Sequence, residues 1–299
     1  MTRRHVLGMS LVTTISAVGG GLERVGGSCQ QVAQETAGPF PADGSNSSGG
    51  AIKNVLTDPR VLRRDIRSDF DGKNPQVGVP FELSLKVRNL DRDCEAWAGC
   101  FVYIWHCTAQ GAYSQYSGMM AGGDHEDHHF LRGVQATDEE GVVRFQTIFP
   151  GRYDGRATHI HFEVYAPDAK IGTVDGLDGK LLATSQLAFP ESLTDGEESP
   201  YHDVDVYGKS LTRVLSNEND NVFSDGTETE MLTIVGDSQK GYQASIEVAI
   251  SETPAAPSGP PGGGPPSGGR SGHGGPGGVP PRPAQGEGTP PRPLPSKED

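Results

Sequence analysis

Long apolar runs and positive charge are both scarce in this sequence of 299 residues. The mildly apolar run from Val6 to Val18 is shorter than the about 20 residues that a helix needs to cross a bilayer, so we expect no membrane span. Lysine and arginine total 25 against 39 acidic residues. The resulting net charge of −14 argues against a nucleic-acid partner, which would need a basic surface.

Cysteine is scarce as well, and its spacing excludes the common zinc sites. The cysteines form no Cys-x-x-Cys pair and no zinc-finger spacing with histidine. Four cysteines allow three complete disulfide pairings, and free buried thiols in a reducing compartment fit the sequence equally well. The four are Cys29, Cys94, Cys100 and Cys107.

The two ends of the chain differ from its middle in composition. Arg3 and Arg4 precede the apolar run, a pattern that resembles a bacterial signal peptide of the twin-arginine type. We therefore expect residues 1–28 to be a signal peptide and the protein to be secreted or extracytoplasmic. The alternative is an untargeted, disordered N-terminus. From Pro254 onward the chain holds 14 of its 23 prolines and no aromatic residue, which predicts a disordered Pro/Gly-rich tail over residues 252–299. One domain is expected over residues 29–251.

Short segments of the central region alternate polar and apolar residues, which is typical of β-strands. Turns rich in glycine and aspartate separate these segments, and long amphipathic helices are hard to find. The pattern predicts an all-β fold, an antiparallel β-sandwich core with long loops and little helix. The expected strands span residues 81–88, 102–105, 143–147, 159–164, 182–189 and 242–250.

The strongest candidate for chemistry is the stretch from Pro150 to Ala166, PGRYDGRATHIHFEVYA. Its histidines, His159 and His161, project from the same face of an expected half-buried strand, because successive side chains in a strand switch faces. Two imidazoles so placed can reach a single metal ion. Taken alone, a His-x-His pair in a strand also fits surface decoration or hydrogen bonding in the core.

Four other segments decide how this stretch is interpreted. They are VYIWHCTAQGAYSQY at 102–116, FLRGVQATDEEGVVRFQT at 130–147, TSQLAF at 184–189, and Gly-Pro-Phe at 38–40. With PGRYDGRATHIH, their order and spacing resemble the intradiol ring-cleavage dioxygenases, the family of catechol dioxygenases and protocatechuate 3,4-dioxygenase. The similarity is greatest to the secreted single-chain branch and covers about residues 34–250.

The resemblance implies a metal centre and a pocket beside it. The family binds one non-haem Fe(III) per chain through two tyrosines and two histidines. The matching positions are Tyr113, Tyr153, His159 and His161. A second set matches residues that face or surround the substrate, although Ser185 interrupts the family's Thr-Gln pattern before the last of them. This set is Arg156, Gly38, Pro39 and Gln186.

The chemistry explains these residue types. Phenolate is a hard anionic donor that favours ferric iron, and a bound cation draws the proton from tyrosine. The resemblance implies a catechol-type small molecule and O₂ as substrates, cleaved to a cis,cis-muconate-type diacid. Tyr153 would act as catalytic base once substrate displaces it, and Arg156 would stabilise negative charge on the ring. Relatives assemble as homodimers or larger, and the sequence does not identify the ring substituents.

Two other functions fit parts of the pattern. One is a non-catalytic β-sandwich that binds ligands at the cell surface, and the other is an extradiol or cupin-type Fe(II) dioxygenase. The presence of all four ligand positions and of Arg156 argues against the first, and the two tyrosines in register argue against the second. Several nearby residues are not expected to bind the metal. Tyr116 is not the ligand, and His106 is packed in the core. The segment from Asp124 to His129 is expected to form a loop and not a second metal site, and Arg132 and Asp138 are expected to brace turns.

Overall fold

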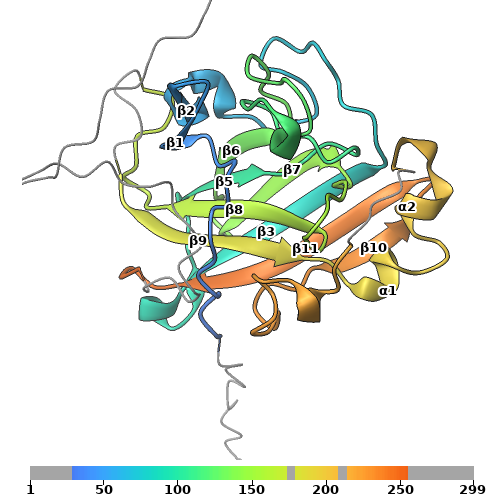
Figure 1. Ribbon diagram of the computed structural model, residues 1–299. Coiled ribbons are helices and arrows are strands. Elements are labelled where there is room, and N and C mark those ends of the chain that lie inside the picture. Colours follow the sequence, from blue (N-terminus) through green and yellow to red (C-terminus); the bar gives the residue numbers. More distant parts are fainter. Residues whose placement is uncertain (1–28, 174–178, 208–213, 255–299) are drawn as a thin grey trace, which may run out of the picture. The chain divides into compact units, whose positions relative to one another are not determined.

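The computed structural model describes residues 29–173, 179–207 and 214–254. Figure 1 shows them as a layered β-structure fringed by loops. The signal peptide expected over residues 1–28 and the tail from residue 255 onward lie outside the described residues. Within those residues no helix is long and apolar enough to cross a membrane.

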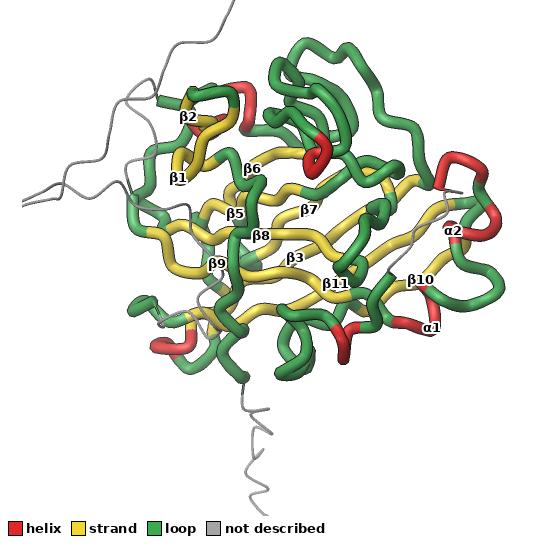
Figure 2. The backbone as a smooth tube through the Cα atoms, viewed as in Figure 1, coloured by secondary structure: helices red, strands yellow, loops and turns green. Residues whose placement is uncertain are grey.

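Two sheets form the sandwich, and a short hairpin lies beside them (Figures 1 and 2). The four-stranded sheet has the order β6-β5-β8-β9, and the five-stranded sheet has the order β10-β11-β3-β4 with β7 also paired to β3. The strands of the first sheet are β5 (Phe101–Trp105), β6 (Arg132–Ala136), β8 (His159–Tyr165) and β9 (Leu181–Ala188). Those of the second are β3 (Pro80–Asn89), β4 (Glu95–Ala96), β7 (Val142–Ile148), β10 (Thr233–Asp237) and β11 (Gly241–Ile250), and the hairpin is β1 (Asp43–Ser48) with β2 (Ala51–Asn54).

Helix is confined to single turns in the described part of the chain. The α-helices α1 (Glu191–Thr194) and α2 (Pro200–Asp203) have four residues each. The remaining turns are the 3₁₀ helices η1 (Val55–Thr57), η2 (Pro59–Val61), η3 (Leu90–Arg92), η4 (Met119–Ala121), η5 (Asp205–Tyr207) and η6 (Asn217–Asn219). The expected all-β sandwich with little helix is confirmed, and all six expected strands are present.

One strand pair departs from the antiparallel expectation. β11 runs parallel to β3, with Tyr242 beside Phe81 and Ile250 beside Asn89. Every other pairing between the named strands is antiparallel. Alternation identifies a strand but not its partner, and a parallel pair needs a long crossover connection, here the chain between β3 and β11.

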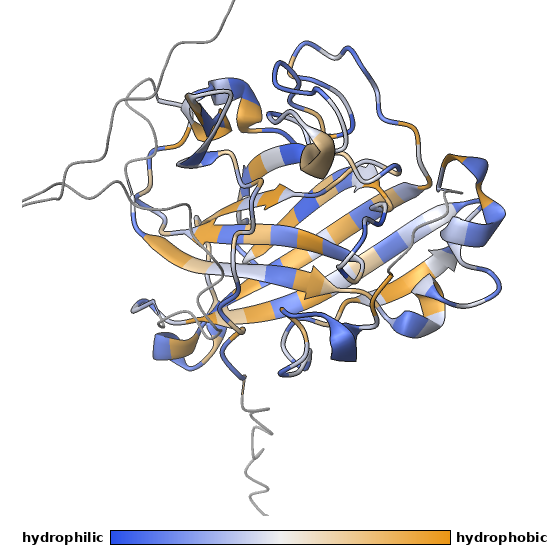
Figure 3. Cartoon of the chain, viewed as in Figure 1, coloured by the Kyte–Doolittle hydropathy of each residue, from blue (hydrophilic) through white to orange (hydrophobic). Residues whose placement is uncertain are grey.

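The two sheets bury their facing side chains against each other. Figure 3 shows apolar residues alternating with polar ones along the strands. In β8 the apolar set, Ile160, Phe162 and Val164, packs in this central core. Its other face carries His159 and His161, and every residue of β8 is buried. The expectation of a half-buried strand is therefore wrong, because loops cover the outer face of the four-stranded sheet.

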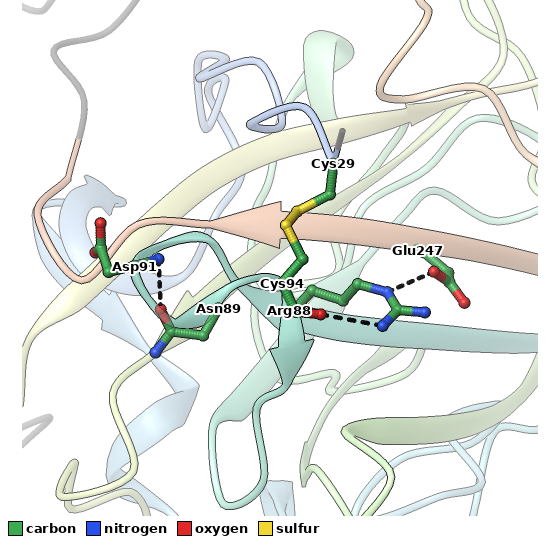
Figure 4. Close-up of a disulfide and its surroundings, with 6 residues drawn as sticks. All are labelled: Cys29, Arg88, Asn89, Asp91, Cys94 and Glu247. Carbon is green, nitrogen blue, oxygen red and sulfur yellow. Dashed lines mark hydrogen bonds and ion pairs between the residues drawn. A yellow bond between two sulfur atoms is a disulfide. The ribbon is translucent and has the colours of Figure 1, made fainter. Parts of the chain in front are cut away.

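A disulfide between Cys29 and Cys94 anchors the start of the described chain (Figure 4). It closes a separation of 65 residues, which in the chain-entropy model stabilises the fold by about 4 kcal/mol. Cys100 and Cys107 are free and buried. Beyond the disulfide, the backbone N–H of Val32 donates to Ala249 O, and that of Glu35 donates to Thr184 O. The N-terminal segment thereby passes from one sheet to the other and reaches the outer face of β8.

Candidate metal centre

Four side-chain tips meet above the outer face of β8. His159 Nε2 lies 3.1 Å from His161 Nε2, 3.0 Å from Tyr153 Oη and 3.5 Å from Tyr113 Oη. Metal–nitrogen and metal–oxygen bonds of about 2.0–2.2 Å place neighbouring donors on one ion about 3 Å apart. The structure thus brings together all four residues that the sequence singled out as ligands, at a spacing that fits one metal ion.

Strand register explains why the histidines are held so firmly. Trp105 of β5 and Gln186 of β9 both lie opposite His161 of β8, and Arg132 of β6 lies opposite Trp105. These four residues therefore form one row across the sheet, on the face that carries the cluster. The Trp105 and His161 rings stack, with centroids 4.9 Å apart and planes 3° apart. Such stacking fixes the His161 ring in one orientation.

Both imidazoles are in the neutral form that a metal requires. Burial lowers the pKa of His159 well below its usual value, and the positive Arg156 adds to the effect. Burial also lowers the pKa of His161, together with His159 and Arg156. His159 Nδ1 lies 2.7 Å from Ala157 O, so Nδ1–H donates to this carbonyl and the Nε2 lone pair faces the cluster.

The two tyrosines need a cation to ionise. Burial raises the pKa of Tyr153 to about 12 and that of Tyr113 well above its usual value. In the protein alone both are phenols, and a bound cation would shift them to phenolates. Two neutral imidazoles and two tyrosines that ionise on cation binding form a donor set that suits a hard ferric ion better than a soft metal.

Arg156 lies at the edge of the cluster. Its Nη1 is 3.4 Å from His159 Nε2, and its Nη2 donates to Gln186 Oε1 at 2.6 Å. Gln186 is fully buried and donates to Thr36 O. Ser185, which interrupts the family pattern, is paired with Glu230 and leaves Gln186 beside the cluster.

The N-terminal segment closes the cluster from above. Gly38 has φ +69°, and a Cβ added there would lie 3.3 Å from His161 Cε1, so a side chain at this position would press on the imidazole. The Phe40 ring stacks on Tyr113 with centroids 4.9 Å apart. Pro39 between them is exposed, and its carbonyl accepts from Asn46 Nδ2. Gly38 therefore lies against the predicted ligands, whereas Pro39 is on the rim.

Comparison with known proteins matches part of the chain to a family model. The family model described as Dioxygenase matches residues 61–174, which include all four clustered residues and Arg156. The match shows a dioxygenase domain in this part of the chain, in agreement with the resemblance to the intradiol ring-cleavage dioxygenase family. Members of this family are oxidoreductases that cleave aromatic rings.

Solved structures share the fold of this dioxygenase. One is an intradiol ring-cleavage dioxygenase from Tetranychus urticae, with 23% identity over 77% of this chain and 98% of that chain, at a TM-score of 0.57. Another is the dioxygenase Tetur07g02040, with 24% identity over 77% of this chain and 97% of that chain, at a TM-score of 0.56. No curated protein matches the chain.

The residues that the sequence analysis did not expect to be ligands make other hydrogen bonds in this dioxygenase. Tyr116 Oη donates to Asn46 Oδ1 and accepts from Ala42 N–H, so it points away from the cluster. His106 is buried, with Thr147 Oγ1 2.7 Å from its Nε2. Among the described residues no group of three or more His, Cys, Asp or Glu side chains is arranged to hold a metal.

Two supports of the site go beyond the sequence-based expectations, since Arg132 was expected only to brace a turn and Asp220 was not singled out. Arg132 is fully buried and donates to Ser114 Oγ, to Ser114 O and to Pro41 O, so it ties the loop of Tyr113 to the N-terminal segment. Asp220 is also fully buried and pairs with Arg156. It comes from a polar run, Asn217 to Asn221, whose composition is typical of a solvated loop.

Stability should depend on pH through two carboxyl groups near Gln186. Burial raises the pKa of Glu230 to about 8, with Glu35 adding to the effect, and burial likewise raises the pKa of Glu35 to about 7. Between the usual carboxyl pKa and these values, the folded state holds protons that the unfolded state has released. The free energy of unfolding should therefore fall as pH rises from about 4.5 to 8.

We expect Glu230→Gln to flatten this dependence. The pKa of Glu230 is raised from 4.5 to about 8, and each tenfold change in proton affinity is worth about 1.4 kcal/mol, so the variant should gain up to about 4 kcal/mol relative to wild type between pH 5 and pH 8.5. Urea unfolding at the two pH values measures the difference, with the exposed Glu82→Gln as control. Equal pH slopes for wild type and Glu230→Gln would show that Glu230 is ionised in the folded protein.

Proposed function

We propose that this dioxygenase holds one Fe(III) per chain through Tyr113, Tyr153, His159 and His161, and that it cleaves a catechol-type ring between its two hydroxyl-bearing carbons. The second substrate is O₂ and the product is a cis,cis-muconate-type diacid. The observation that carries the proposal is the convergence of two tyrosine hydroxyls on the His159–His161 pair, within 3.5 Å of His159 Nε2.

The two tyrosines differ in ways that suit different roles. Tyr113 is 1% exposed and packs against the Phe40 ring, so it is a fixed ligand. Tyr153 is only half-buried and lies on the loop before β8. When bound, the ferric ion supplies Lewis acidity that draws electron density from a catechol. Because burial raises the pKa of Tyr153 to about 12, a displaced Tyr153 phenolate is a strong enough base to take a catechol proton.

Arg156 and Gln186 provide the polar wall beside this centre. The guanidinium reaches the cluster through Nη1, so it would lie beside a substrate bound at this centre. Its fixed positive charge stabilises negative charge that develops on the ring carbons. An Fe(II) centre of two histidines and one carboxylate is disfavoured, because the oxygen donors beside His159 are the hydroxyls of Tyr113 and Tyr153.

Product analysis tests the proposal. Wild-type protein loaded with iron is supplied with catechol, protocatechuate, hydroxyquinol or a lignin-derived catechol, and the products are separated and identified by mass and NMR. We expect a muconate-type diacid from at least one of them, with one O₂ consumed per ring. A yellow semialdehyde, which results from cleavage beside the hydroxyl pair, would overturn the proposal.

The family resemblance also implies a homodimer. Sedimentation of the same preparation tests this oligomeric state.

We propose further that the enzyme works outside the cytoplasm. The twin arginine, which lies outside the described residues, supports export of folded protein. The Cys29–Cys94 disulfide supports it as well, because such bonds persist in oxidising compartments.

Replacing Arg3 and Arg4 by lysine should trap the enzyme inside the cell. The twin-arginine route depends on both guanidinium groups, so the lysine pair preserves charge and removes the signal. Immunoblots of cytoplasmic and exported fractions measure the distribution. The control is Arg24→Lys, which changes an arginine outside the pair and should leave export intact. Export of the double-lysine variant at the wild-type level would exclude this route.

A further inference from the structure

We propose that Asp220 is a positioning residue for Arg156, and that the Asp220–Arg156 pair sets the direction in which the guanidinium faces the metal centre. The inference rests on the proposed function and deepens it. Asp220 lies outside the residues that match the family model, and it comes from a loop far along the chain from Arg156.

The hydrogen bonds of Arg156 leave its guanidinium little freedom. Nε donates to Asp220 Oδ2 at 2.8 Å, and Nη2 donates to Gln186 Oε1 at 2.6 Å. A guanidinium is planar and rigid, so anchoring two of its nitrogens determines where the third one points. The third, Nη1, is the nitrogen that lies 3.4 Å from His159 Nε2.

Asp220 is itself held in place by the backbone. Its Oδ2 also accepts from Ala157 N–H at 2.6 Å, and its Oδ1 accepts from Val222 N–H at 2.8 Å. The carboxylate therefore joins the turn of Arg156 and Ala157 to the loop that carries Val222. Val222 and Phe223 pack with Ala157 in a separate buried cluster, which keeps this loop on the turn.

Charge makes the pair more than a geometric support. The Arg156 side chain is 13% exposed and the Asp220 side chain is fully buried. A buried cation that loses its counter-ion is strongly disfavoured. Arg156 should respond to loss of the carboxylate by turning toward solvent, which would take Nη1 away from the cluster while leaving the four predicted ligands in place.

The test is Asp220→Ala in the full-length, iron-loaded enzyme. We expect kcat to fall about 10²-fold, as for loss of a preorganised charged donor, while iron content and the resting visible band stay at wild-type values. Formate or acetate should enter the space left by the carboxylate and restore kcat with saturation. The control is Asp138→Ala, which breaks another Asp–Arg pair, with Arg144, and should neither lose kcat nor respond to formate.

A second readout does not depend on turnover. In metal-free protein the Arg156 Nε–H should give a protected ¹⁵N–¹H signal, assigned by its absence in Arg156→Lys. The signal should vanish in Asp220→Ala and return with formate. Asp220→Asn, which keeps the shape but not the charge, covers the case in which the alanine variant fails to fold, and it should lose kcat without formate rescue.

The kinetic and NMR experiments separate the positioning role of Asp220 from the proposed ring-cleavage function. Wild-type kcat in Asp220→Asn, or an unchanged Nε–H signal in Asp220→Ala, would overturn the positioning role. Absence of ring cleavage by the wild type would overturn the proposed function, and the NMR arm would still decide whether Asp220 orients Arg156.

Discussion

Arg156→Leu is expected to keep its iron and its resting colour and to lose about 10²- to 10³-fold in kcat. Arg156 is not among the four clustered side chains, yet its Nη1 reaches within 3.4 Å of His159 Nε2. Removing one preorganised donor from the place where charge develops costs this much in comparable sites. The substrate KM should change less, because the guanidinium acts chiefly once negative charge has built up on the ring.

Arg152→Leu is the matched control for this prediction. Arg152 lies in the same loop, pairs with Asp195 and stacks over the Tyr201 ring, with its guanidinium carbon 3.7 Å from the ring centroid. Its loss should lower thermal stability and leave kcat near wild type. Steady-state kinetics and melting curves of both variants separate the two effects. An Arg156→Leu enzyme at full speed would show that the charge on Arg156 does not contribute to the reaction.

His159→Ala is expected to lose bound iron, visible colour and all measurable ring cleavage. His159 Nε2 is the atom on which the tips of Tyr113, Tyr153 and His161 converge, so its removal takes away the centre of the donor set. Metal analysis and the optical spectrum of purified protein measure the loss.

His106→Gln controls for the general cost of altering a buried histidine. His106 is 1% exposed and bonded to Thr147, away from the cluster. This variant should melt at a lower temperature and still bind one iron per chain. If His159→Ala kept stoichiometric iron, or if His106→Gln lost it, the assigned donor set would be wrong.

Local sequence patterns predicted six of the strands, but not β1, β2, β4, β6 and β10, and not the pairing of the strands. The alternation of Phe81, Leu83 and Leu85 with polar residues predicts β3, and the same pattern predicts β11. Nothing in either segment reveals that the two run parallel. The burial of β8 on both faces depends on loops distant in the sequence. The alternating pattern alone therefore predicted a half-buried strand.

The site shows the same division between near and distant residues. Tyr153, Arg156, His159 and His161 fall within nine positions, and their types and spacing predict the cluster. Gln186 follows only from the family resemblance, because its place depends on the register between β8 and β9. Asp220 was missed, since a buried aspartate in a polar run resembles a solvated one until the loop is folded. The cysteine pairing was likewise undetermined until Cys29 was placed beside Cys94.

The optical spectrum of purified wild-type enzyme, taken together with its metal content, tests the central claim most directly. Tyrosinate bound to Fe(III) gives a red-brown charge-transfer colour, and Tyr113 and Tyr153 are placed to supply it. We predict one iron per chain, a visible band that changes in Tyr153→Phe, and loss of the band on chelation. Active enzyme that contains stoichiometric zinc and shows no visible absorption would contradict the account.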